Sequence, residues 1–89
     1  MTDPYMLTIQ VKLVARELTP GLENGEFRAK SGATVRDVLA LCSARCEAAF
    51  PSDNLCRFMY PLYNGKPLTL DSPLSEDGTL HICRVAIGG

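Results

Sequence analysis

Few residues of this 89-residue chain could carry chemistry: two glycines at its end, four cysteines and a single histidine. Gly88 and Gly89 follow an apolar stretch, and no further residue makes them part of a turn. Glycine loses more conformational entropy on folding than other residues and adds no packing, so the simplest alternative is a frayed end. We instead expect a thin end segment that enters a narrow site, with the α-carboxylate of Gly89 as the reacting group.

The cysteines Cys42, Cys46, Cys56 and Cys83 allow three interpretations. Disulfides need an oxidising compartment, yet the first residues lack the basic and long apolar regions of a secretory signal. Zinc is an alternative because Cys42 and Cys46 stand one helical turn apart, but Cys56 and Cys83 do not form a second short-spaced pair. The C-x₃-C-x₉-C spacing also differs from the C-x₄-C-x₂-C run of plant-type ferredoxins, which excludes an iron–sulfur cluster of that type. We expect no metal, and reduced thiols that act mostly as small buried hydrophobes in a cytoplasmic protein.

The composition excludes several classes of protein. Hydrophobic residues make up 46% of the chain and charged residues 21%, and the net charge is −1. A nucleic-acid binder usually has a basic excess, and a membrane helix needs a long apolar run; neither is present. A chain this small, with one histidine and no tryptophan, is not expected to be an enzyme by itself. It is expected to work with a partner protein.

The first half of the chain predicts a hairpin followed by a helix. Residues 5–15 and 26–30 alternate between apolar and polar side chains, which is typical of half-buried strands. Thr34 and Asp37 have the spacing of a capping box, and apolar residues then recur at helical intervals. A helix over residues 35–49 is therefore expected to cover one face of a small sheet.

The second half predicts three strands, over residues 55–63, 67–70 and 79–86. Residues 55–63 are apolar in both parities, and Pro61 implies a sheet edge or a bulge there because it cannot donate to a ladder. The sequence does not decide which side chains of this segment face outward: either Phe58, Tyr60 and Leu62, or Met59 and Tyr63. In the last strand, Leu80 and Ile82 are expected to point into the core.

Five segments, in order and over nearly the whole chain, resemble the MoaD/ThiS family of β-grasp sulfur carriers: LTIQVKLVA, ATVRDVL, LYNGKPL, SPLSEDGTLHI and VAIGG. These ubiquitin-like proteins end in Gly-Gly. The resemblance implies an α+β β-grasp fold with a mixed four- to five-stranded sheet and one main helix across one face. It implies a single domain over residues 1–89, with a flexible C-terminal tail at 86–89.

The resemblance also implies a function. An E1-like enzyme would use ATP to adenylate Gly89, a thiocarboxylate would replace the adenylate, and the sulfur would pass to a synthase large subunit during cofactor biosynthesis. The chain lacks a G-x-x-x-x-G-K-[ST] loop, so the ATP is expected to be bound by the activating partner and no cofactor by the chain itself. The length favours a molybdopterin-type over a thiamine-type pathway, although the Phe-Phe-Pro-Pro stretch of the molybdopterin group is missing.

In such carriers the sheet face away from the helix meets the partner. Counting back from Gly89 places Cys83 and Val85 on that face. Together with Met59, Ile87 and Gly88 they are the expected partner-binding residues. Two other functions remain open: a ubiquitin-like modifier conjugated to lysine through Gly89, and an interaction module whose end is inert.

Overall fold

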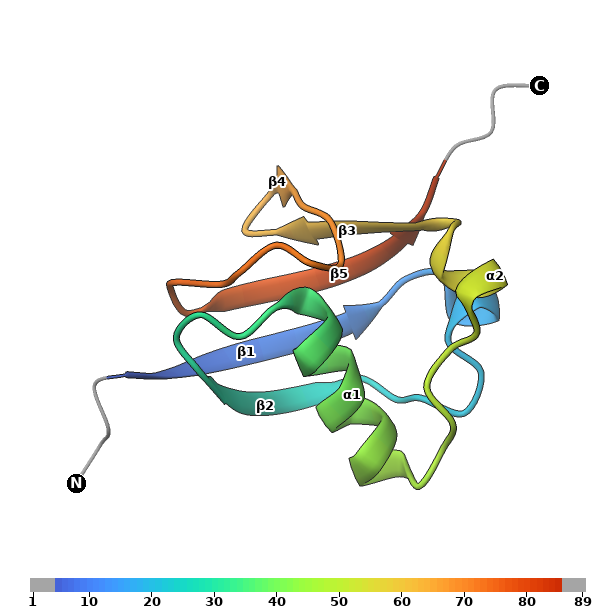
Figure 1. Cartoon of the computed structure of the whole chain (residues 1–89), viewed down its shortest axis with the longest axis horizontal. Helices are drawn as coiled ribbons and strands as arrows, with labels where there is room; N and C mark the ends of the chain where they lie inside the picture. Colours follow the sequence, from blue (N-terminus) through green and yellow to red (C-terminus); the bar gives the residue numbers. More distant parts are fainter. Residues whose placement is uncertain (1–4, 86–89) are drawn as a thin grey trace.

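A computed structural model describes residues 5–85, and these residues form one mixed sheet with a main helix across one face (Figure 1). The strand order is β2-β1-β5-β3-β4, in which β1 and β5 are parallel and the other neighbours antiparallel. The predicted α+β class is confirmed. The elements are β1 (Met6–Leu13), the 3-10 helix η1 (Arg16–Leu18), β2 (Gly25–Lys30), α1 (Val35–Cys46), α2 (Asp53–Cys56), β3 (Met59–Tyr63), β4 (Lys66–Pro67) and β5 (Gly78–Arg84).

The alternation of β1 decides which face of the sheet is buried. Leu7, Ile9, Val11 and Leu13 are each at most 6% exposed and point toward α1. β1 lies in the middle of the sheet and pairs with β2 on one side and β5 on the other, as the register pairs of Ile9 with Phe27 and with Gly78 show. Because successive side chains of a strand point to opposite faces of the sheet, β1 directs its apolar side chains into the core and its polar side chains to the outer face.

α1 begins at the predicted capping box. The Thr34 hydroxyl accepts a hydrogen bond from the Asp37 amide at 3.1 Å, and the Asp37 carboxylate accepts one from the Thr34 amide at 3.0 Å. The helix ends at Cys46, three residues earlier than the predicted 35–49 span, because Glu47 adopts a left-handed conformation with φ of 52°. Such a residue terminates a helix by redirecting the chain.

The strand predicted over residues 55–63 is half wrong. Its first part is the short helix α2, which Ser52 caps by accepting a hydrogen bond from the Leu55 amide at 3.3 Å. Only Met59–Tyr63 is extended, as β3. The expected piece at 67–70 likewise pairs only through Lys66–Pro67. An apolar run does not by itself distinguish a short helix from a strand. Here the Ser52 cap stabilises the helical conformation at the start of the segment.

Pro61 lies in β3 without a bulge. The amides of Val85 and Asn64 donate to the carbonyls of Phe58 and Thr79, at 2.8 and 3.1 Å. By antiparallel alternation, the even-numbered residues of β3 bond to β5, and the nitrogen of Pro61 points toward β4. β4 pairs only with the last two residues of β3, so proline removes no donor from the β5 ladder. The predicted sheet edge or bulge at Pro61 is therefore not found: β3 lies between β5 and β4, and the Leu68 amide donates to the Pro61 carbonyl at 2.9 Å.

The core lies between the sheet and α1 and continues under the loops that follow β1 and β4. Among residues 5–85, twelve side chains are less than 2% exposed: Ile9, Leu18, Leu22, Leu39, Leu74, Leu80, Ile82, Val11, Val35, Val38, Thr19 and Cys42. They come from both halves of the chain, so the core joins the N-terminal hairpin to the C-terminal strands.

Candidate functional site

The end of β5 brings the chain to its last residues. β5 extends to Arg84 in the middle of the sheet, and the sequence then continues with Val85 and Ala86-Ile87-Gly88-Gly89. The predicted reacting residue Gly89, the partner-binding residues Gly88 and Ile87, and the whole tail 86–89 lie outside the described residues. The structure therefore describes the surface from which these residues depart.

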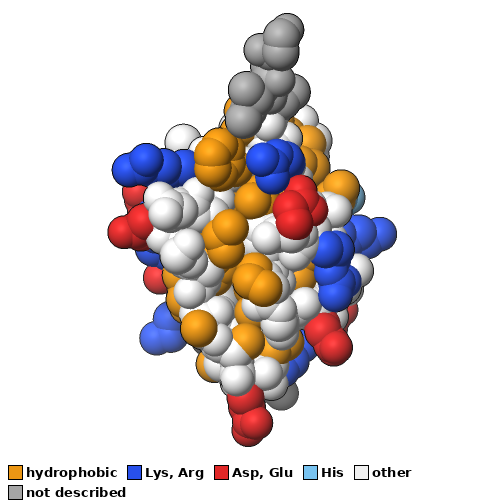
Figure 2. All heavy atoms as spheres, turned by 90° about the vertical axis from the view of Figure 1, so that its right-hand side faces the viewer, with side chains coloured by type: hydrophobic (Ala, Val, Ile, Leu, Met, Phe, Trp, Pro, Cys, Tyr) orange, Lys and Arg blue, Asp and Glu red, His pale blue; other side chains and the backbone are white. Residues whose placement is uncertain are grey.

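The outer face of the sheet at this point is apolar. Leu80 and Ile82 are fully buried, whereas Cys83 is partly exposed and Val85 is 38% exposed, as the parity of the last strand predicted. Tyr60 lies opposite Cys83 in the register of β3 and β5 and is 42% exposed. Figure 2, which looks onto this end of the molecule, shows hydrophobic side chains around the last described residues.

Val14 completes this surface. It lies between the buried Leu13 and Ala15, is 61% exposed, and its amide donates to the Ile82 carbonyl at 3.0 Å, next to Cys83. Val14 continues the outward parity of β1, a signal in the sequence that could have identified it as part of this surface. The four side chains Val14, Tyr60, Cys83 and Val85 are called the β5-end patch below. Exposed apolar clusters of this kind mark interaction sites on small domains.

Met59 does not belong to this surface. Its side chain is 6% exposed and faces the core together with Tyr63, so its predicted place among the partner-binding residues is wrong. The antiparallel register with β5 sets this parity, because Met59 lies opposite Arg84 and Tyr60 lies opposite Cys83. Of the two alternatives, Tyr60 and Leu62 face outward. Phe58 precedes the strand and packs against the core.

Arg84 holds the end of β5 in place. Its guanidinium lies 3.6 Å from the Glu17 carboxylate and 5.2 Å from the centre of the Phe58 ring. The amide of Val85 donates to the Phe58 carbonyl at 2.8 Å. Both partners of the ion pair are about half exposed, so its contribution to stability is small. Its effect is to fix the direction of the Arg84 side chain at the end of β5.

All four cysteines are free thiols. Cys42 is fully buried, and burial raises the pKa of its thiol. Cys46, Cys56 and Cys83 are only partly buried, so the expectation that the cysteines act mostly as buried hydrophobes holds fully for Cys42 alone. Within residues 5–85, no three metal-binding side chains come together. Over the same range, no helix has the length and apolar character needed to cross a membrane.

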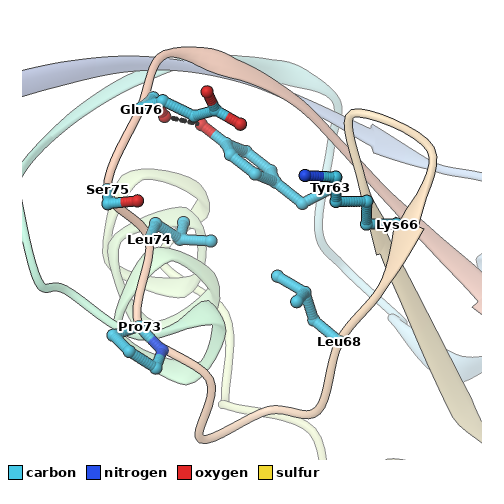
Figure 3. A pocket seen from close by; sticks show the side chains of 7 residues that line it. All are labelled: Tyr63, Lys66, Leu68, Pro73, Leu74, Ser75 and Glu76. Carbon is cyan, nitrogen blue, oxygen red and sulfur yellow. Dashed lines mark hydrogen bonds between the residues drawn. The ribbon is translucent and has the colours of Figure 1, made fainter.

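Two pockets lie away from the β5-end patch. One, of about 150 Å³, is at the opposite end of β3, where Leu68 and Leu74 project into it and the Tyr63 hydroxyl donates to the Glu76 carbonyl (Figure 3). The other, of about 210 Å³, adjoins the end of α1. Sites for drug-sized ligands measure roughly 300–1,000 Å³. Neither of these two pockets reaches that size.

No family model matches the sequence, and no curated protein matches it. Solved structures do resemble it. SAMP1 from Haloferax volcanii is 20% identical, with 92% of this chain and 99% of that chain covered and a TM-score of 0.62. A Pyrococcus furiosus protein, provisionally assigned as molybdopterin converting factor subunit 1, is 18% identical, with 90% and 99% covered and a TM-score of 0.59. A protein designed on the basis of ubiquitin is 15% identical, with 97% and 96% covered and a TM-score of 0.61. These similarities show the fold, which is the predicted ubiquitin-like β-grasp.

Proposed function

We propose that this chain is a cytoplasmic sulfur carrier, and thus a protein co-substrate rather than an enzyme. An E1-like enzyme adenylates the carboxylate of Gly89 with ATP and releases pyrophosphate. The outer sulfur of a persulfide donor attacks the adenylate and displaces AMP, which leaves an acyl disulfide between Gly89 and the donor. A second thiol of the donor or the activating enzyme then cleaves the S–S bond, forming a disulfide with the donor sulfur and releasing the Gly89 thiocarboxylate. The thiocarboxylate gives up its sulfur at the large subunit of a synthase during cofactor biosynthesis. A molybdopterin-type pathway is preferred over a thiamine-type one, on the chain length and on the name of the Pyrococcus furiosus neighbour.

The observation that carries the proposal is the position of the β5-end patch. The patch surrounds the end of β5, and only three residues lie between Val85 and Gly89 in the sequence. A carboxylate is a poor electrophile at neutral pH, so it must be activated as a mixed anhydride by a separate ATP-binding protein. Binding energy from the β5-end patch would hold the chain on that protein while its last residues enter the active site. This separation of binding from the reacting atom is how remote contacts promote a reaction.

Intact mass spectrometry tests the proposal. The chain is incubated with an E1-like enzyme from its own source, Mg-ATP and sulfide, and then weighed. Exchange of carboxylate oxygen for sulfur adds about 16 Da. A variant with one alanine added after Gly89 should keep its fold and gain no mass. The same measurement establishes whether the mature chain ends at Gly89.

A pair of substitutions tests the β5-end patch. Val85→Asp places a charge within the patch and should slow activation at least about tenfold, because a carboxylate must then be desolvated at the interface. Ala40→Asp introduces the same charge at an exposed position of α1 and should leave the rate unchanged. Isopeptide adducts on lysine would support the modifier function instead. If AMP is never transferred to Gly89, neither function applies.

A further inference from the structure

The free edge of the sheet is the backbone of β2. β2 is the outermost strand next to β1, and the Ser31 amide donates to the Tyr5 carbonyl at 2.6 Å. Antiparallel alternation then directs the N–H groups of Glu26, Arg28 and Lys30 away from β1. No amide of these three residues has a partner among the interactions of residues 5–85. An edge of this kind can accept one more strand.

α1 forms a wall beside this edge through Arg45. The guanidinium of Arg45 lies 3.8 Å from the centre of the Phe27 ring, where Phe27 belongs to β2. Gly25 leaves room for it, since a Cβ there would be only 3.0 Å from an Arg45 terminal nitrogen. Within residues 5–85 the guanidinium makes no hydrogen bond or ion pair. Stacking thus fixes the position of the guanidinium while its N–H donors remain unused.

An apolar side chain and a pocket lie beside Arg45. Leu41, one helical turn earlier on the same side of α1, is 42% exposed. The pocket of about 210 Å³ lies at the end of the wall and is lined by Gly21, Glu23, Asn24, Arg45 and Cys46. The surface that consists of the β2 edge, Leu41 and Arg45 is called the α1–β2 groove below.

The cations on both sides of the β2 edge favour an acidic occupant. Arg45 lies on the α1 side, whereas Arg28 and Lys30 are exposed on the outer face of the sheet, because they pair in register with Thr8 and Met6. None of the three has an acidic partner in the described part of the chain. The carboxylate of Glu26 is already held by the Gln10 amide at 2.6 Å. A second copy pairing through β2 would bring two sets of cations together, which is unfavourable.

We propose that the α1–β2 groove binds an extended, acidic peptide segment of a partner protein. The segment adds a strand to β2, places apolar side chains against Leu41, and offers a carboxylate to Arg45, which binds such groups in a bidentate manner. This proposal goes beyond sulfur transfer. The groove and the β5-end patch are separated by β1, so both can be occupied at once.

The experiment uses the full chain and a synthetic peptide, Asp-Asp-Val-Asp-Val-Asp-Asp, which presents valines and a terminal aspartate on one face in either direction. Binding is measured from amide chemical shifts and by fluorescence anisotropy. Arg45→Gln should weaken binding about tenfold, because a charge-assisted pair is lost. Arg57→Gln, the same change at an exposed arginine outside the groove, should weaken it less than about twofold. A peptide with lysine in place of aspartate should not bind, and methylating alternate backbone amides should abolish binding.

Shifts confined to β2 and to the Leu41–Arg45 side of α1, together with the loss in Arg45→Gln, would support the proposal. Absence of binding, shifts on the outer face of β3 and β5, or equal effects of the two arginine substitutions would overturn it. Concentration-dependent shifts of β2 without peptide would identify a second copy as the occupant and would also overturn it. None of these results depends on the activation of Gly89, so the two proposals fail separately.

Discussion

Gly78→Ala is predicted to destabilise the fold, although Gly78 is at the start of a strand and has no left-handed backbone angle. A Cβ at this position would collide with the side-chain amide of Asn64. That amide accepts a hydrogen bond from the Thr79 amide at 3.0 Å and donates to the Asp77 carbonyl at 3.1 Å. The added methyl group must displace the side chain that ties the β3–β4 turn to the start of β5.

The expected cost follows from these contacts. Each of the two hydrogen bonds to the backbone contributes about 0.5–1.5 kcal/mol. Alanine also reduces the conformational entropy of the unfolded chain, which stabilises the folded state by about 0.4–1 kcal/mol and offsets part of this loss. The free energy of unfolding should therefore fall by about 1–2 kcal/mol. For a domain of this size, the Tm should fall by roughly 5–15 °C.

Urea unfolding of four proteins tests this reasoning: the native chain, Gly78→Ala, Asn64→Gly, and the double variant. Asn64 has a φ of 52°, which glycine adopts without strain, so Asn64→Gly removes only the side chain. In the Asn64→Gly variant, Gly78→Ala should leave the free energy of unfolding unchanged or raise it slightly. An equal loss of stability from Gly78→Ala in both backgrounds, or no loss in the native chain, would contradict a collision between the added methyl group and Asn64.

Three further predictions concern single side chains. Burial, and then the carboxylates of Asp77 and Glu76, raise the pKa of the Tyr63 hydroxyl above its ordinary value of 10.0. The unfolded chain therefore loses this proton at a lower pH than the folded protein, and the free energy of unfolding should fall as the pH rises above 10.0. Tyr63→Phe should lower the free energy of unfolding by about 1 kcal/mol at pH 7, and the variant should not lose further stability through this group at alkaline pH. Urea unfolding at pH 7 and at a pH above 10.0 measures both effects. Iodoacetamide should modify Cys83 in the native protein and Cys42 only after unfolding, by peptide mass mapping, since Cys42 is fully buried. Thr34→Ala should lower the free energy of unfolding by about 1 kcal/mol through loss of the cap, and an unchanged thermal midpoint would contradict this.

Local patterns were sufficient where one physical rule determines the outcome. The strict alternation of β1 identifies its buried face, because a polar side chain at every second position can only face water. The Thr34–Asp37 spacing places the start of α1, because the cap bonds form within four residues. Counting parity along β5 also placed Cys83 and Val85 on the outer face. In each case the interactions that matter are close in sequence.

Other features needed the tertiary structure. Residues 55–63 are apolar in both parities, so only pairing with β5 determines that Met59 faces inward and Tyr60 outward. The position of Arg45 over Phe27 joins α1 to β2 and has no local signature. The sequence by itself determined the secondary structure that depends on capping and alternation, together with the Gly-Gly end. Packing between distant segments decided the composition of the β5-end patch and of the α1–β2 groove, because contacts between residues far apart in sequence form only when the core assembles.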